Sequence, residues 1–439
     1  MTESRMADFS GPTPKVDALR PHVGRSVSAP ISAVVTLALI AVVVSRRPDT
    51  VLHPQFWAED GTFWFAAAYN DGPLVALQTP AGGYFQSFSR LTAALSLLFG
   101  LRWAPLTFGL AAILVQILAP LYLLSSRLAV SIPDLRLRAL LALLILGVPN
   151  SFEVQSNVTN AQTHLAVLGF LIVVADEAEG WPARIFDVLG LVLAGLSGPT
   201  CLMLVPVAAI AYLRERRSGR RKLILVVTTA LALAQGAAIV TTGPATRVAT
   251  PLGASVLRLL ALIGGQIFVA GTLGAKIYAT VFSILGEASI TASTIGFAGL
   301  VFIGRIFVLT TSFQLRMALL FGTLVLSAAL ISPVVGSPPR WRTLQMPNVG
   351  VRYYVIPIAA YLAALLWASC ADPCPALRRV SRVGLLAVLL VGMPLDWRVD
   401  PRPDLGFEKH VAAFEAAPAG SLVRIPIPPA GWEMHLRKR

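Results

Sequence analysis

The sequence predicts an all-α polytopic membrane protein with about 11 transmembrane helices, in a range of about 10 to 13. Hydrophobic residues make up 56% of the 439 residues, charged residues make up 13%, and the mean hydropathy is +0.72. A soluble protein of this length could not keep so much apolar surface away from water. The basic residues stand in short clusters between the apolar runs, a pattern that orients membrane helices.

The net charge of +14 comes from these clusters and not from a separable basic domain. We therefore predict no nucleic-acid partner and expect the clusters to contact membrane lipids. The three cysteines are Cys201, Cys370 and Cys374. Their odd number excludes a complete disulfide framework, and no further Cys or His follows the last two closely, so no metal or other cofactor is predicted.

Residues 1–29 are polar, rich in Pro and Ser, and carry four basic residues. They are predicted to form a disordered cytoplasmic tail. The first apolar run, residues 30–44, begins a transmembrane domain that extends to residue 395. Because Ser45-Arg46-Arg47 follows it instead of a small-residue cleavage site, this run is predicted to be an uncleaved signal anchor. It delivers a first outer loop, residues 45–103, to the extracytoplasmic face.

The most unusual feature of that loop is the acid pair Glu59-Asp60, which lies among aromatic residues in the stretch 55–65. Adjacent carboxylates repel each other and gain nothing from apolar neighbours. One interpretation is structural, with solvated loop acids or acids that complement the dipole of a short interfacial helix. The other is functional, because perturbed carboxylates gather at active sites.

The topology depends on residues 84–125. The apolar run 91–101 is too short to span and is predicted to be an interfacial helix, whereas residues 104–124 can cross. This choice places the most basic short loop, residues 214–222, in the cytoplasm, as the positive-inside rule requires. Two crossings in residues 84–125 would invert everything that follows.

Further crossings are predicted by the remaining apolar runs, of which 185–213 is a helical hairpin broken at Ser197-Gly198-Pro199. A second large outer loop, residues 242–289, carries its own apolar stretch and Lys276, which is predicted to be buried. Residues 396–439 form an extracytoplasmic segment in which 423–434 are predicted to be a strand and a turn. The other predicted crossings are residues 139–149, 161–175, 223–241, 290–304, 313–331, 351–369 and 383–395.

Two polar interruptions fall on the predicted outer side, at residues 148–160 and 196–200. Backbone that leaves a helix at membrane depth must line a cavity or be buried in protein. Asn157, Asn160 and His164 could each be a helix cap or an interhelical hydrogen bond, and together they could line a polar cavity. A single His such as His164 is more often a satisfied interface residue than a catalytic one.

Residues 348–357 place Arg352 and Tyr353 at the outer entrance of a predicted span. Arg352 could snorkel to the interface, and the tyrosine could belong to the aromatic belt. Alternatively, a guanidinium beside tyrosine hydroxyls suits a phosphate.

The order of these features resembles the GT-C superfamily of integral-membrane glycosyltransferases, and the short motifs look like those of its bacterial, especially actinobacterial, members. The resemblance covers most of residues 30–439 and includes GT-C-like extracytoplasmic loops and interfacial helices. It is carried by the first-loop residues Glu59, Asp60, Gly83, Tyr84 and Arg90, and by the tail Arg424-Ile425-Pro426-Ile427-Pro428-Pro429-Ala430-Gly431-Trp432.

The resemblance implies transfer of a sugar from a polyprenyl-phosphate donor to a glycan or glycolipid acceptor of the cell envelope. The reaction would occur on the extracytoplasmic face of the plasma (inner) membrane, with inversion. Asp60 would be the general base, and Glu59 would position it or orient the acceptor. The donor phosphate and the substrate would be bound by Arg352, Tyr353, Arg90, Lys276, Arg247, His164, Asn157 and Asn160.

Relatives that use sugar pyrophosphates often carry several metal-binding acids. Here Glu153 alone joins the acid pair, so metal dependence is not predicted. The alternative function is a lipid-glycan flippase or transporter that uses the same cavity without chemistry. Transporters commonly show internal repeats, and the sequence shows none. A third alternative is an enzyme-like fold that serves as a structural partner in an envelope complex.

Overall fold

The computed structural model describes residues 29–177, 180–246, 250–287, 289–335 and 338–439. The tail predicted to be disordered lies outside the described residues, apart from Ala29. The described chain is mostly helical and has five helical segments long and apolar enough to cross a membrane. They are Ser87–Leu124, Gly219–Gly243, Val256–Leu273, Ile290–Leu309 and Phe313–Ile331.

The other apolar helices in the described chain have 10 to 17 residues. They are Ser32–Arg46, Ala161–Val174, Cys201–Arg214, Ala275–Leu285 and Val355–Ala371. A straight helix needs roughly 20 residues to cross the hydrocarbon core. Length and composition therefore support five crossings in the described residues, and they do not confirm the predicted number of about 11.

Most helices of the first group pack around α8, whose sequence is apolar on every side, as expected for a helix enclosed by others, and α1 packs on α6. α9 and α10 are separated at residues 197–200, so the predicted break of the 185–213 hairpin is confirmed. The group consists of α1 (Ala29–Arg46), α6 (Gly100–Leu124), η4 (Ser126–Leu128), α7 (Leu135–Leu146), α8 (Ala161–Val174), α9 (Gly180–Leu196), α10 (Cys201–Arg214) and α11 (Gly219–Thr246).

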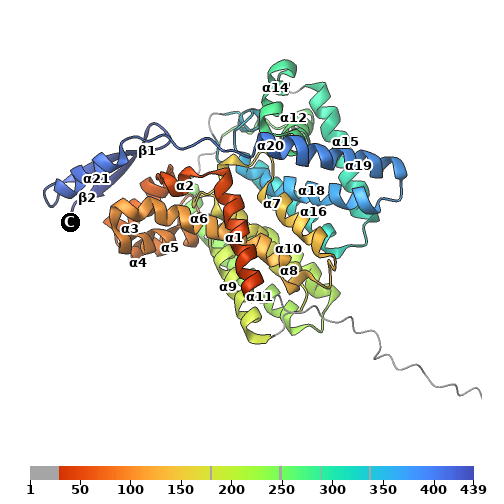
Figure 1. The fold of residues 1–439 in the computed structure, drawn as a ribbon, viewed down its shortest axis with the longest axis horizontal. Coiled ribbons are helices and arrows are strands. Elements are labelled where there is room, and N and C mark those ends of the chain that lie inside the picture. The colour runs from red at the N-terminus through yellow and green to blue at the C-terminus, as the bar shows by residue number, and fades with distance from the viewer. Residues whose placement is uncertain (1–28, 178–179, 247–249, 288, 336–337) are drawn as a thin grey trace, which may run out of the picture.

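The second group lies on the other side of α7 (Figure 1). A Cβ on Gly264 would lie 2.0 Å from the carbonyl oxygen of Ala292, so glycine lets two helices of this group touch through their backbones. The group consists of α12 (Val256–Leu262), η6 (Ile263–Val269), α13 (Ala270–Leu273), α14 (Ala275–Leu285), α15 (Ile290–Leu309), α16 (Phe313–Ile331), α17 (Arg340–Gln345), α18 (Val355–Ala371), α19 (Pro375–Ala387), η8 (Val388–Gly392) and α20 (Met393–Leu395).

The apolar stretch predicted in the second outer segment, residues 242–289, is confirmed, and one expectation for this segment is wrong. It contains a helix of 18 residues, Val256–Leu273, that is apolar enough to cross a membrane. Gly264, Gly265 and Gln266 interrupt its apolar pattern, and the π-helical turn η6 accommodates them without breaking the helix. Lys276 is exposed and not buried, because it stands in the first turn of α14 with its side chain outside the packed face.

Residues 87–124 form a nearly continuous helical segment of α5 (Ser87–Ser96), η3 (Leu97–Phe99) and α6. Its 38 residues would extend about 57 Å if straight, well beyond a hydrocarbon core of about 30 Å. The backbone changes direction at Gly100, where φ is +76°. α5 then lies with the first-loop helices α3 and α4 (Figure 1).

The first loop and the C-terminal segment share one hydrophobic core. Phe56 and Trp64 from the loop pack in the same cluster as Phe407 from α21 and Ile425 from β1. The loop contains α2 (Asp49–Leu52), η2 (Asp60–Phe65), α3 (Ala66–Asn70) and α4 (Pro73–Gln78), and the C-terminal segment contains α21 (Phe407–Ala416), β1 (Leu422–Ile427) and β2 (Trp432–Arg437).

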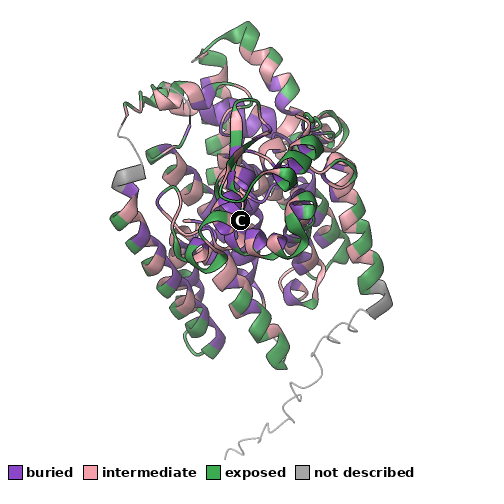
Figure 2. Ribbon diagram, turned by 90° about the vertical axis from the view of Figure 1, so that its left-hand side faces the viewer, coloured by how far each residue is buried: buried purple, intermediate pink, exposed green. Residues whose placement is uncertain are grey.

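The strands β1 and β2 pair antiparallel, from Leu422 opposite Arg437 to Ile427 opposite Trp432. The predicted strand and turn are therefore confirmed as a hairpin. Figure 2 views the molecule from this end, with exposed residues on the outer faces of the elements and buried residues toward the centre.

Replacing Ile425 by Ala should destabilise the protein by about 2–4 kcal/mol, because its side chain is fully buried in the shared core. The matched control in the same strand is Leu422→Ala, which should change stability by less than about 0.5 kcal/mol because Leu422 is 56% exposed. Thermal unfolding in detergent measures both, and equal losses would mean that the hairpin does not dock on the loop.

Candidate active site

Asp60 begins the π-helix η2 directly after a sharp turn in the chain. Ala58 has a positive φ of 44°, which few residues other than glycine adopt, and its N–H donates to the carbonyl of Pro428 at 2.6 Å. The Asp60 N–H donates to Trp57 O at 2.8 Å, which closes this turn, and the wide π-helix follows. The Asp60 side chain is thereby buried, with 1% of its surface exposed.

One oxygen of the Asp60 carboxylate is held by Thr159. Oδ1 accepts hydrogen bonds from the Thr159 N–H at 3.1 Å and from the Thr159 hydroxyl at 2.9 Å. The indole N–H of Trp64 in turn donates to that hydroxyl at 2.8 Å, which fixes its orientation. Within the described residues Oδ2 accepts no hydrogen bond, so the carboxylate is fixed in place with one oxygen available.

The surroundings raise the pKa of Asp60 from 3.8 to about 7. Burial is the main cause, because it penalises the charged form, and the negative charge of Glu59 adds to it. The positive charge of Arg402 and the hydrogen bonds from Thr159 act in the opposite direction. A carboxylate with this pKa can take a proton near neutral pH.

Glu59 is half-buried and lies on a different side of the turn. Burial raises its pKa, the charge of Arg352 lowers it and the charge of Glu153 raises it again. A hydrogen bond from its own backbone N–H also lowers the pKa, and among the described residues its side chain forms no ion pair. The two acids therefore have different environments: Asp60 is fixed by Thr159, and Glu59 lies near the Arg352 and Glu153 pair.

Arg352 lies in the short turn η7 (Val351–Tyr353), just before α18. Its N–H donates to Glu153 Oε2 at 3.0 Å, and its guanidinium forms an ion pair with Glu153. The guanidinium also donates to Val334 O at 2.7 Å and stacks on the Tyr353 ring at 4.8 Å. Burial lowers the pKa of Arg352, but Glu153 and Tyr353 outweigh burial and hold it above its usual range. Arg352 is a fixed cation whose partner is a carboxylate.

The polar residues of the 148–160 loop support its backbone. Asn157 and Asn160 both donate from their side-chain amides to Glu153 O, at 3.4 and 3.0 Å. The His164 ring is hydrogen-bonded to Val154 O at 3.0 Å. All three are buried. They stabilise the loop that supplies Glu153 to Arg352 and Thr159 to Asp60.

The other cations expected to bind phosphate occupy different places. Arg90 is buried in α5, where it donates to Phe63 O and Thr79 O at 3.4 and 3.3 Å and lies 4.8 Å over the Trp64 ring. It therefore braces the first loop. Lys276 is exposed on α14, and Arg247 lies outside the described residues.

The sequence did not assign Thr159 or Arg402 to the site, and it indicated Glu153 only as a further acid and not as the partner of Arg352. Arg402 is buried and donates to Gln55 O at 2.8 Å and to Ser156 O at 2.9 Å. One feature of the sequence could have indicated Arg402. Arg402 stands in a segment predicted to be extracytoplasmic, where the positive-inside rule gives an arginine no role in topology.

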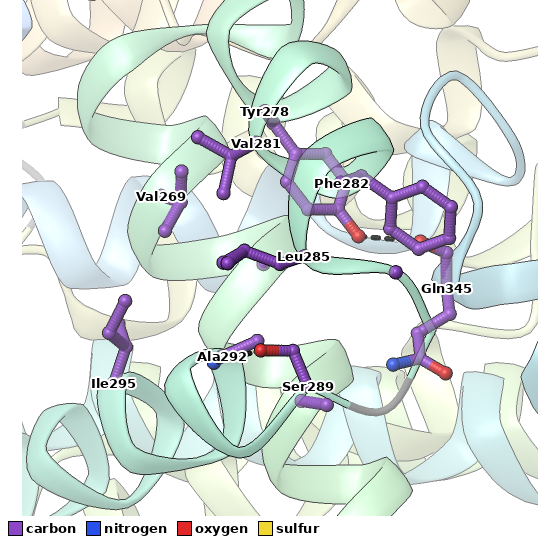
Figure 3. A pocket seen from close by; sticks show the side chains of 12 residues that line it. Val269, Tyr278, Val281, Phe282, Leu285, Ser289, Ala292, Ile295 and Gln345 are labelled. Atoms are coloured by element: carbon purple, nitrogen blue, oxygen red, sulfur yellow. Dashed lines mark hydrogen bonds between the residues drawn. The ribbon is translucent and has the colours of Figure 1, made fainter.

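A small cavity of about 20 Å³ lies between η6, α14 and α15 (Figure 3). The Tyr278 hydroxyl beside it donates to Gln345 O at 2.5 Å. Gln266 donates to the carbonyls of Leu344 and Met346 at 2.9 and 3.0 Å. None of the lining residues comes from the acid stretch. This region therefore holds the chain before Arg352 in place.

A much larger apolar groove, of about 400 Å³, runs along α18. It is lined from Ile356, four residues after Arg352, to Ala371 at the far end of the helix. α7, α8 and α16 supply its other walls, mostly with leucine, alanine and phenylalanine side chains. The groove thus begins beside the turn that carries Arg352.

Within the described residues, no group of three or more His, Cys, Asp or Glu side chains is arranged to hold a metal ion. No known family model and no curated protein matches the chain.

Replacing Asp60 by Asn should stabilise the protein more at pH 8 than at pH 5. The folded-state pKa of about 7 lies above the unfolded value of 3.8, so the folded state binds more protons between them. Ionisation of Asp60 therefore costs stability as the pH rises through this window, and Asn removes that cost.

Thermal unfolding of both proteins from pH 5 to pH 8 measures the effect. The control is Glu415→Gln, because Glu415 is an exposed acid on α21. A stability difference between wild type and Asp60→Asn that stays constant over this range would contradict the burial of an ionisable Asp60.

Proposed function

We propose that the protein is a membrane glycosyltransferase that transfers a sugar from a polyprenyl-phosphate donor to a glycan or glycolipid acceptor of the cell envelope. The observation that carries the proposal is Asp60, a buried carboxylate held through one oxygen, with a pKa of about 7. A hydroxyl acceptor needs such a base to become a nucleophile. The sequence resemblance to GT-C glycosyltransferases supports the same function.

In the proposed reaction Asp60 Oδ2 accepts the proton of the acceptor hydroxyl. The acceptor oxygen forms a bond to the anomeric carbon while the bond from that carbon to the phosphate oxygen breaks. The phosphate leaves from the opposite face with the bonding electron pair, so the configuration inverts. Glu59, which is half-buried beside Asp60, orients the acceptor.

The leaving phosphate carries negative charge that a fixed cation can stabilise. Arg352 is that cation, and its planar guanidinium suits a phosphate as well as a carboxylate. In the described structure this guanidinium forms an ion pair with Glu153. In the proposed complex the donor phosphate takes the place of Glu153.

The apolar groove supports a donor with a long lipid tail. From Ile356 to Ala371 the groove follows 15 helical steps of α18, which is about 22 Å. A phosphate bound at Arg352 would lie one turn before its beginning. An isoprenoid chain could then extend along α18 within the apolar layer, where its burial is favourable.

We further propose that the site faces the extracytoplasmic side of the plasma membrane, in a multi-pass GT-C fold of about 11 crossings. α8 begins beside the site, at Asn160, and its last carbonyls accept hydrogen bonds from Arg220 and Arg221. These arginines belong to the most basic loop of the chain, which the positive-inside rule places in the cytoplasm. The site stands at the other end of this helix.

The test is sugar transfer by the purified protein from labelled polyprenyl-phosphate sugars to envelope acceptors. Asp60→Asn should lower the rate by about a hundred to ten thousand fold, the usual loss when a general base is removed, while donor binding is kept. Glu59→Gln is the matched control and should lower the rate much less.

A dead Glu59→Gln with an active Asp60→Asn would exchange the two roles. Near-normal transfer by both variants would contradict catalysis by the acid pair. Translocation of a lipid-linked glycan in liposomes, without transfer by the wild type, would favour the flippase alternative.

A further inference from the structure

The C-terminal segment passes directly over the first loop at Arg402. Pro401 and Pro403 flank this residue and restrict the backbone on both sides. The Arg402 N–H donates to Asp49 Oδ2 at 3.0 Å, and the guanidinium lies 5.7 Å from the centre of the Trp57 ring. Arg402 is 8% exposed, so its charge is taken out of water.

The guanidinium bridges the two segments that form the Asp60 environment. One terminal nitrogen donates to the carbonyl of Gln55, five residues before Asp60, at 2.8 Å. The other donates to the carbonyl of Ser156, three residues before Thr159, at 2.9 Å. Arg402 therefore ties the acid to the segment that supplies its hydrogen-bond donor.

Arg402 and Asp60, both described by the structure, form no direct ion pair, although their charges act on each other. Asp187, in contrast to Asp60, is paired directly with arginines. Its carboxylate forms ion pairs with Arg127 at 2.6 Å and with Arg220 at 2.9 Å. A direct pair of that kind would hold a carboxylate ionised but make it a poor base.

Other charged groups come from the elements that pack around Asp60. Glu59 is on the same turn, Arg90 comes from α5 and donates to Phe63 O, and Glu433 comes from β2, which contacts η2. Glu59 is the neighbouring negative charge that acts on Asp60, and Arg402 is the positive one.

We propose that Arg402 is a positioning residue for Asp60: it bridges the segments that carry Asp60 and Thr159 and holds a positive charge near the carboxylate without pairing with it. The inference rests on the proposed function only for its kinetic consequence. Its structural consequence is that loss of the charge leaves only the hydrogen bonds from Thr159 to oppose burial, so the pKa of Asp60 rises further.

The experiment follows the protonation of Asp60 by infrared spectroscopy of the full-length protein. The C=O stretch of a protonated Asp60 is identified by its absence in Asp60→Asn. Arg402→Gln should move the titration midpoint upward by about one pH unit or more, because it removes a nearby opposite charge. The matched control is Arg47→Gln, since Arg47 is also a buried arginine that bridges loop carbonyls, those of Gln155 and Asp400. It should leave the midpoint unchanged.

Arg402→Lys separates the charge from the bridge. The lysine keeps the charge, so the midpoint should stay within about half a pH unit of wild type. It lacks the planar guanidinium that donates to the carbonyls of Gln55 and Ser156. The transfer rate should therefore fall about tenfold with little change in KM. An unchanged midpoint in Arg402→Gln overturns the electrostatic role. If Arg402→Gln does not fold, full transfer by Arg402→Lys overturns the bridging role.

The infrared titration does not require transfer activity. A shifted midpoint in a protein that transfers no sugar would uphold the role of Arg402 and contradict the proposed function. An unshifted midpoint in a protein that transfers sugar would uphold the proposed function and contradict the electrostatic role of Arg402.

Discussion

Three buried arginines hold the loops at the active-site end of the helices together. A guanidinium removed from water must have its donors satisfied, and here backbone carbonyls far apart in the sequence satisfy most of them. Arg46 and Arg47 end α1, and Arg402 lies in the C-terminal segment. Together they donate to the carbonyls of Gln55, Leu146, Gln155, Ser156, Asp396, Trp397 and Asp400. The first loop, the 148–160 loop and the C-terminal segment are thereby fixed as one unit.

This unit places two unlike electrostatic environments side by side. Asp60 is buried and has no direct cationic partner among the described residues, so its pKa rises to about 7. Arg352 is fixed by Glu153 next to an apolar groove. The proposed reaction needs a base at one position and a cation for a leaving phosphate at the other. Glu59, with a raised pKa and no paired partner in the described chain, lies between them.

Local features of this molecule could be predicted from the sequence, and long-range pairings could not. Apolar periodicity indicated helices such as α16 over residues 313–331, and the turn residues indicated the C-terminal hairpin. The acid pair was recognised from its neighbours. Thr159 lies 99 residues from Asp60, and Glu153 lies 199 residues from Arg352, separations over which no periodicity acts. Lys276 was wrongly predicted to be buried because its apolar neighbours do not reveal which side of α14 packs.

A structure of the full-length protein in lipid nanodiscs with a polyprenyl monophosphate bound tests the proposed donor site most directly. We expect the phosphate to replace Glu153 on the guanidinium of Arg352, and the isoprenoid tail to follow the groove along α18. We also expect Asp60 Oδ2 to face the space beside the phosphate. An intact Arg352 and Glu153 pair, with the lipid bound elsewhere on the molecule, would contradict this site.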